Sequence, residues 1–152
     1  MLQNSRFSGG WYDLSPELQI PDEWEFVNLA GEPNPISGDG WNEFVTPEVR
    51  VLSPDFLPPA EWPVFVAPEN TQVVKAFKGY GAWWGGFRQQ VALPVGQHTA
   101  VVELFADLVD RYEDGEKVWA PDPLSGRVRV LLDGRATLWI DLVAGQRLTY
   151  YL

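Results

Sequence analysis

The stretch Lys75–Gly96, KAFKGYGAWWGGFRQQVALPVG, decides how the chain is interpreted, because it places two adjacent tryptophans in a glycine-rich loop. Glycine lets a chain bend sharply, so the loop can present large flat side chains. The segment after the loop alternates like a strand, with Arg88 and Gln90 on the face opposite to Phe87 and Gln89. An aromatic loop that leads into an amphipathic strand predicts a binding surface on a β scaffold rather than a catalytic centre.

The composition favours a β protein with many turns. The chain has 152 residues, of which 8 are Trp, 14 are Gly and 13 are Pro. Abundant glycine, proline and aromatic residues are typical of short strands joined by turns. This length fits one domain with its own core, so we expect a single domain over residues 1–152. A proline-rich excursion is expected at about 30–68.

The charge balance argues against two kinds of partner. A count of 21 acidic and 11 basic residues gives a net charge of −10, which repels nucleic-acid phosphates and anionic membrane surfaces. The chain has no cysteine, so disulfides and thiolate metal sites are excluded. The first residues lack the basic start and apolar run of a secretory signal. We expect an extracellular location or a particle surface, reached after signal removal or by another route.

Alternation and turn residues predict an antiparallel β-sandwich or jelly roll of about eight strands. A first strand is expected within residues 2–12, and Leu18–Ile20 is interpreted as a brief edge strand beside prolines. Thr71–Phe77 is a further strand. Gln97–Arg111 is interpreted as one long strand, although its apolar residues three and four apart also allow a helix; the β-branched first half and the weak N-cap favour the strand.

The C-terminal third carries the clearest hairpin signal. The runs at 127–132 and 136–143 alternate and are joined by Asp133-Gly134, a pair typical of a tight β-hairpin turn. The residues before them, Glu113–Gly126, are interpreted as a loop. Arg147–Leu152 is the last expected strand.

The residue types largely exclude catalysis. His98 is the only histidine and no cysteine accompanies it, so we expect neither a nucleophilic triad nor a histidine metal centre. Glu103 and Asp107 lie four residues apart on one strand, about 13 Å, which is too far for glycosidase carboxylates. The acidic run from Asp110 to Glu116 lacks EF-hand spacing and is interpreted as a solvated turn. We therefore expect no enzyme activity, no metal and no cofactor.

The aromatic residues remain as the functional signal. A flat ring covers the C–H side of a sugar while planar polar groups pair with its hydroxyls. Strand phase and the aromatic loop predict the following ligand-binding residues: Tyr80, Trp83, Trp84, Arg88, Gln90, Glu103, Phe105, Asp107 and Trp139. The alternative for Trp83 and Trp84 is a hydrophobic cap over the sheet. Trp24 and Trp41 are interpreted as plugs at the ends of the sandwich.

Three segments carry a resemblance to a known family. The opening Asn4–Trp11, NSRFSGGW, is similar to the N-x-x-F-E-x-G-x-W start of carbohydrate-binding modules with the galactose-binding-like jelly roll. Gln19–Trp24, QIPDEW, resembles their P-x-x-W segment, and Val73–Gly96 resembles their strand, loop and Q-x-V-x-x-x-x-G passage. The likeness spans most of residues 3–111 and implies this fold and glycan binding. Ser8 stands where the motif has glutamate, which argues against the family's structural calcium.

Two functions follow from these observations. The first is a non-catalytic carbohydrate-binding module. The second is a structural or adhesive jelly-roll protein of a virus particle, a decoration, tail or fibre component, whose exposed aromatics contact other subunits. If Trp139–Val143 is the family's final strand, then the terminal strand is extra, and Tyr150 and Tyr151 would suit a homo-oligomer interface.

Overall fold

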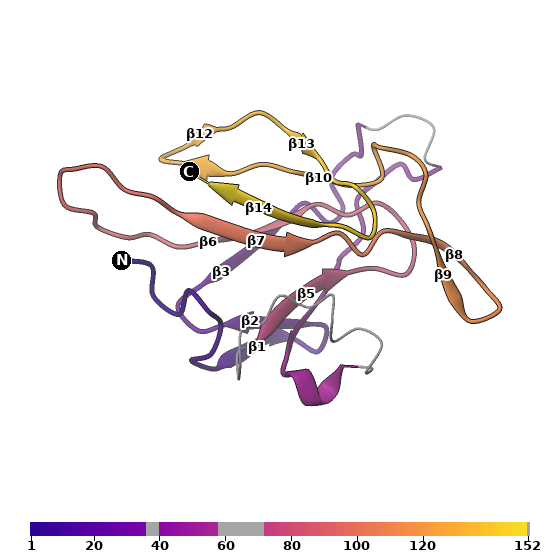
Figure 1. The fold of residues 1–152 in the computed structure, drawn as a ribbon, viewed down its shortest axis with the longest axis horizontal. Helices are drawn as coiled ribbons and strands as arrows, with labels where there is room; N and C mark the ends of the chain where they lie inside the picture. The colour runs from indigo at the N-terminus through magenta and orange to yellow at the C-terminus, as the bar shows by residue number, and fades with distance from the viewer. Residues whose placement is uncertain (36–39, 58–71, 152) are drawn as a thin grey trace. The chain divides into compact units, whose positions relative to one another are not determined.

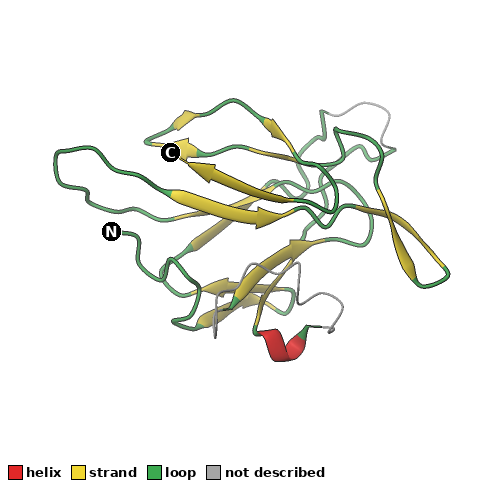
Figure 2. Cartoon of the chain, viewed as in Figure 1, coloured by secondary structure: helices red, strands yellow, loops and turns green. Residues whose placement is uncertain are grey.

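The computed structural model describes residues 1–35, 40–57 and 72–151, and in these residues the chain is all-β (Figure 1). Their regular structure consists of fourteen short strands and one single-turn 3-10 helix, η1 (Pro54–Phe56) (Figure 2). The all-β prediction is confirmed. The strands outnumber the expected eight or so because several predicted strands are interrupted and one loop proves to be a hairpin.

The chain divides into two compact units, each described here by itself. The described residues up to Val95 belong to the first unit, and those from Gly96 onward belong to the second. The strands of the first unit are β1 (Trp11–Ser15), β2 (Leu18–Pro21), β3 (Glu25–Asn28), β4 (Glu48–Leu52), β5 (Val73–Phe77) and β6 (Gly85–Arg88). Those of the second are β7 (Val101–Phe105), β8 (Val109–Glu113), β9 (Glu116–Trp119), β10 (Arg127–Val128), β11 (Leu131–Leu132), β12 (Arg135–Ala136), β13 (Ile140–Asp141) and β14 (Arg147–Tyr151).

A four-stranded sheet in the order β1-β2-β4-β5 organises the first unit. The ladders β1–β2 and β4–β5 are antiparallel, and β2 meets β4 in parallel at the pair Leu18↔Val49. The predicted edge position of β2 is therefore wrong, because this strand lies between β1 and β4. Its burial agrees with an inner strand: Leu18, Ile20 and Pro21 are all buried.

The core of the first unit draws side chains from the sheet and from the β3–β6 ladder. Its buried residues are Leu18, Ile20, Phe26 and Val49, with Trp24, Val74, Ala76 and Phe87 packed against them. Phe26 and Phe87 are cross-strand partners whose ring centroids lie 5.1 Å apart. Phe87 therefore faces inward and Arg88 outward, as the alternation after the aromatic loop predicted.

The second unit contains four antiparallel two-stranded ladders in its described residues: β7–β14, β8–β9, β10–β13 and β11–β12. The predicted strand Gln97–Arg111 is confirmed as strand rather than helix but is divided into β7 and β8. The division falls at Ala106, whose N–H donates to the Gln146 carbonyl at 3.0 Å while its carbonyl accepts from Gly145 at 2.8 Å. The first strand, β7, therefore ends at Phe105, and the second, β8, begins at Val109.

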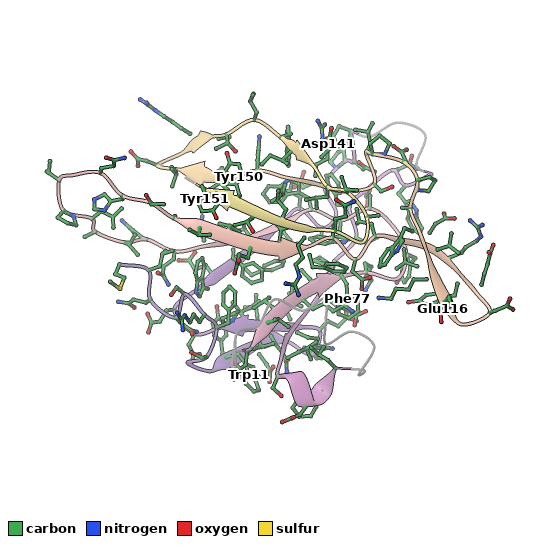
Figure 3. The ribbon with its side chains drawn as sticks, in the orientation of Figure 1. Trp11, Phe77, Glu116, Asp141, Tyr150 and Tyr151 are labelled. Carbon is green, nitrogen blue, oxygen red and sulfur yellow. The ribbon has the colours of Figure 1, made fainter. Side chains whose placement is uncertain are left out.

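The terminal strand β14 pairs with β7 of the same chain. Five residue pairs form this ladder, and they include Tyr150↔Val102 and Tyr151↔Val101 (Figure 3). One edge of β14 therefore forms its backbone hydrogen bonds with β7, within the second unit. A subunit contact through Tyr150 and Tyr151 stays a prediction.

Two Asp-Gly pairs form the tight turns of the second unit. Asp133 and Gly134 have φ values of 49° and 74°, and Leu132 pairs with Arg135 across them, so the predicted hairpin is confirmed. Asp114 and Gly115 have φ values of 51° and 86° and close the β8–β9 hairpin in the same way. The loop predicted at Glu113–Gly126 is therefore wrong over its first residues, which form β9.

Parts of three expectations lie outside the described residues. These are residues 36–39 and 58–68 of the expected proline-rich excursion, together with Thr71 and Leu152 at the ends of two predicted strands. Within the described part of the excursion, β4 and η1 are regular. No helix in the described ranges has the length and hydrophobicity that crossing a bilayer requires.

Candidate functional site

The glycine-rich loop of the first unit is fixed by backbone hydrogen bonds. Val45 N–H donates to the Ala82 carbonyl at 2.9 Å, and Leu29 N–H donates to the Trp84 carbonyl at 3.2 Å. Gly81 has a φ of +81°, and a Cβ at this position would lie 3.0 Å from Val45 Cγ1. The loop therefore needs glycine at residue 81, both for its conformation and for its close approach to the segment around Val45.

The same approach creates a pair of exposed aromatic rings. Trp41 and Tyr80 have ring centroids 5.8 Å apart with a 37° angle between their planes, and they are 40% and 62% exposed. Lys78 Nζ lies 5.4 Å from the Tyr80 centroid, within cation–π range. We call Trp41 and Tyr80 the ring pair.

Polar groups surround the ring pair. The Trp41 carbonyl accepts a hydrogen bond of 3.0 Å from Asn34 Nδ2. The Lys78 ammonium lies 3.6 Å from Glu17 Oε2 and 3.7 Å from Glu48 Oε1, and its side chain is only 9% exposed. The charge of the lysine is thus balanced by two carboxylates.

Trp83 and Trp84, which began as the leading candidates, are both half-buried. Their limited exposure gives a ligand less ring surface than the ring pair does. The interpretation of these tryptophans as a partial cap therefore fits their burial better than full display to solvent.

Arg88 and Gln90 are exposed, as strand phase predicted. The Arg88 guanidinium makes two contacts of 2.7 Å with Glu25 Oε2, its cross-strand partner. Gln89, which was expected on the face opposite to Arg88 and Gln90, is less exposed than they are, and its Nε2 donates to the carbonyls of Gln3 at 3.0 Å and Glu23 at 2.7 Å.

The predicted residues on the 101–109 stretch lie in the second unit. Glu103 is exposed and pairs with Thr149 across the β7–β14 ladder. Phe105 packs edge-on against Trp119, with centroids 6.2 Å apart. Asp107 Oδ1 lies 2.7 Å from Lys117 Nζ, in a pair whose side chains are about one-fifth exposed. Phe105 and Asp107 thus have partners within their own unit.

Trp139, the last predicted residue, lies beside two arginines. The guanidinium carbons of Arg129 and Arg127 are 4.4 Å and 5.8 Å from its ring centroid. Arg127 Nε also donates to Asp141 Oδ1 at 2.6 Å. Trp139 is 40% exposed, so its outward position is confirmed, but Leu138 is 89% exposed and is not the core residue that simple alternation predicted.

The nine predicted site residues are therefore divided between the two units. Five of them belong to the first unit and four to the second. Trp41 was missed because it was interpreted as a plug at the end of the sandwich. Its signal was local: Gly40-Trp41 repeats the glycine–aromatic pattern of Gly79-Tyr80.

Two of the four acidic residues of the run at the β8–β9 hairpin pair with one arginine. Arg111 contacts Asp110 Oδ2 at 2.6 Å and Glu113 Oε1 at 2.8 Å. These hydrogen bonds, first that to Glu113, raise the pKa of Arg111 above its usual value. Across the described ranges, no three His, Asp or Glu side chains gather closely enough to hold a metal ion.

Comparison of the chain with protein-family models, with curated proteins and with solved structures finds no match.

Proposed function

We propose that the chain is a non-catalytic carbohydrate-binding protein that holds a glycan by stacking it on the ring pair. The observation that carries the proposal is the ring pair itself, two exposed aromatics 5.8 Å apart on a loop fixed from both sides. The resemblance to carbohydrate-binding modules supports the same function. It would need no covalent chemistry, metal or cofactor.

Stacking on these rings is favourable for two physical reasons. An aromatic face removes the C–H side of a pyranose from water, and a fixed loop loses little conformational freedom when the ligand binds. Two rings inclined by 37° offer neighbouring faces to consecutive sugars of an oligosaccharide. Since the chain carries a net charge of −10 and two carboxylates lie beside Lys78, neutral glycans are the favoured ligands at this site.

The same proposal includes a specific fold, the galactose-binding-like jelly roll. A galactose-binding-like jelly roll is supported by the all-β content and by the resemblance over most of residues 3–111. A location outside the cell or on a particle surface is where a glycan-binding protein of this kind would meet its ligand.

The test is a titration of the whole chain with a panel of neutral oligosaccharides, followed by tryptophan fluorescence and calorimetry. Trp41→Ala and Tyr80→Ala should each weaken binding about tenfold or more, since truncating an aromatic anchor costs about 1.4 kcal/mol or more. Phe56→Ala is the matched control, because Phe56 is also an exposed aromatic of the first unit but lies on η1. Equal affinities of all three variants and the parent would refute the site.

A second function, a structural or adhesive component of a virus particle, is favoured by the second unit. Among its described residues Ala106 is the only buried hydrophobic, at 4% exposure, whereas Leu138 and Tyr151 are largely exposed. Such a surface is typical of a protein that associates with other copies or subunits. Light scattering over a range of protein concentrations tests it: a strict monomer would count against assembly.

A further inference from the structure

The hairpin from β10 to β13 contains one extra residue on its second strand. The residue pairs are Val128↔Ile140 and Leu131↔Ala136, so two residues on the first strand face three on the second. This count defines a β-bulge. Thr137 N–H donates to the Val130 carbonyl at 2.8 Å, which places the extra residue after Thr137, in the segment that contains Trp139.

The bulge brings Trp139 next to the arginines of the opposite strand. Bulges redirect side chains, and here the ring lies 4.4 Å from the Arg129 guanidinium carbon. Arg127 lies two residues away on the same strand, and its guanidinium carbon is 5.8 Å from the same ring. Asp141 balances the charge of Arg127 at 2.6 Å, so the charge of Arg129 leaves this ring with a local positive site in a chain whose net charge is −10.

The two arginines differ in their partners. Arg127 is paired with Asp141 at 2.6 Å across the ladder. The Nε atom of Arg129 is buried and has no hydrogen-bond acceptor among the described residues. Buried donors are normally satisfied, so the guanidinium of Arg129 is a donor group that lacks its acceptor. The Arg129 residue as a whole is only partly buried.

We propose that Arg129, Arg127 and Trp139 bind the oxyanion of an acidic saccharide, a carboxylate or sulfate group carried on a sugar ring. A guanidinium pairs with such groups through two parallel N–H donors, and stacking on Trp139 fixes its plane. The exposed part of the indole ring then covers the C–H side of the same sugar. The proposal rests on the carbohydrate-binding function but uses residues of the second unit, none of which belongs to the ring pair.

The test compares three oligosaccharides of equal length, one with uronic acids, one sulfated and one neutral, titrated calorimetrically into the whole chain at low and high salt. The parent protein should bind an acidic oligosaccharide at least tenfold more tightly than the neutral one. The uronate and sulfate arms identify which oxyanion is preferred. Equal affinity for all three oligosaccharides would overturn the proposal.

Variants at Arg129 separate recognition from structure. Arg129→Gln should lose at least tenfold in affinity for the acidic oligosaccharide, whereas Arg135→Gln, an equal charge change on the same hairpin, should lose less than twofold. Arg129→Lys keeps the charge and removes the two-donor geometry, so it should also lose most of the preference for the acidic over the neutral oligosaccharide. If circular dichroism shows that Arg129→Gln does not fold, Arg129→Lys is the variant that tests the proposal. An unchanged preference in a folded Arg129 variant would refute the role of this residue.

A variant of the ring pair distinguishes the two sites. Trp41→Ala should lose the neutral oligosaccharide and keep the preference for the acidic one if both proposals hold. If neutral binding is absent from the parent while acidic binding depends on Arg129, the ring-pair function fails and this site stands. If neutral binding depends on Trp41 and no acidic preference exists, this site fails alone.

Discussion

Replacing Gly81 by alanine should destabilise the loop that supports the ring pair. Gly81 has a φ of +81°, and this left-handed conformation costs a residue with a Cβ about 1–2 kcal/mol. The added Cβ would also lie 3.0 Å and 3.1 Å from the two methyl groups of Val45, and crowding of this kind costs about 1 kcal/mol or more. We therefore expect Gly81→Ala to lose about 2–3 kcal/mol of unfolding free energy, equivalent to a Tm lower by about 5–10 °C.

Gly79→Ala is the matched control for this prediction. Gly79 lies two residues earlier in the same loop, has no left-handed φ, and its added Cβ would meet nothing within 4 Å. Its stability should change by less than about 1 kcal/mol. Urea denaturation followed by far-ultraviolet circular dichroism measures both variants, and glycan titration should show weaker binding for Gly81→Ala alone. Equal stability of the two variants would refute the close approach of the loop to Val45.

Two further predictions concern packing and charge. Gly85→Ala should lose about 1–3 kcal/mol of unfolding free energy, because its Cβ would lie 2.6 Å from Phe26 Cζ in the core. The control is Gly86→Ala, whose Cβ would meet nothing within 4 Å. Its stability in the same urea experiment should stay near that of the parent. Asp107→Asn should cost no more than about 1 kcal/mol, because its ion pair with Lys117 is partly exposed, and the loss should shrink in high salt; a salt-independent loss would contradict an electrostatic cause.

Local signals predicted the parts of the fold that depend on neighbouring residues. The Asp133-Gly134 hairpin was predicted because both residues tolerate positive φ and alternating runs flank them. The equivalent signal at Asp114-Gly115 was present but was interpreted as part of a solvated acidic loop. The run at 110–116 has four acidic residues within seven positions, and this composition led to its interpretation as a loop rather than a hairpin.

Features that depend on distant residues could not be predicted in the same way. The inner position of β2 rests on a parallel contact between Leu18 and Val49, which no local pattern encodes. The bulge before Ile140 adds one residue to an otherwise regular alternation, so the pattern of the strand predicted Leu138 as a core residue.

The candidate site was likewise predicted only where it depends on neighbouring residues. The aromatic loop after β5 was identified from its glycines and rings, and Tyr80 is indeed exposed. Its partner Trp41 comes from a segment nearly forty residues earlier, which meets the loop through the close approach of Gly81 to Val45 and the hydrogen bond from Val45 N–H to the Ala82 carbonyl. The proposed binding site is therefore the ring pair rather than the adjacent Trp83 and Trp84.

The most direct test of the proposed function is glycan titration of the double variant Trp41→Ala/Tyr80→Ala against the parent, with circular dichroism as the control for folding. We predict that the parent binds at least one neutral oligosaccharide and that the folded double variant loses this binding at least thirtyfold, which corresponds to about 2 kcal/mol. A folded double variant that binds the same oligosaccharide as tightly as the parent would contradict the proposal.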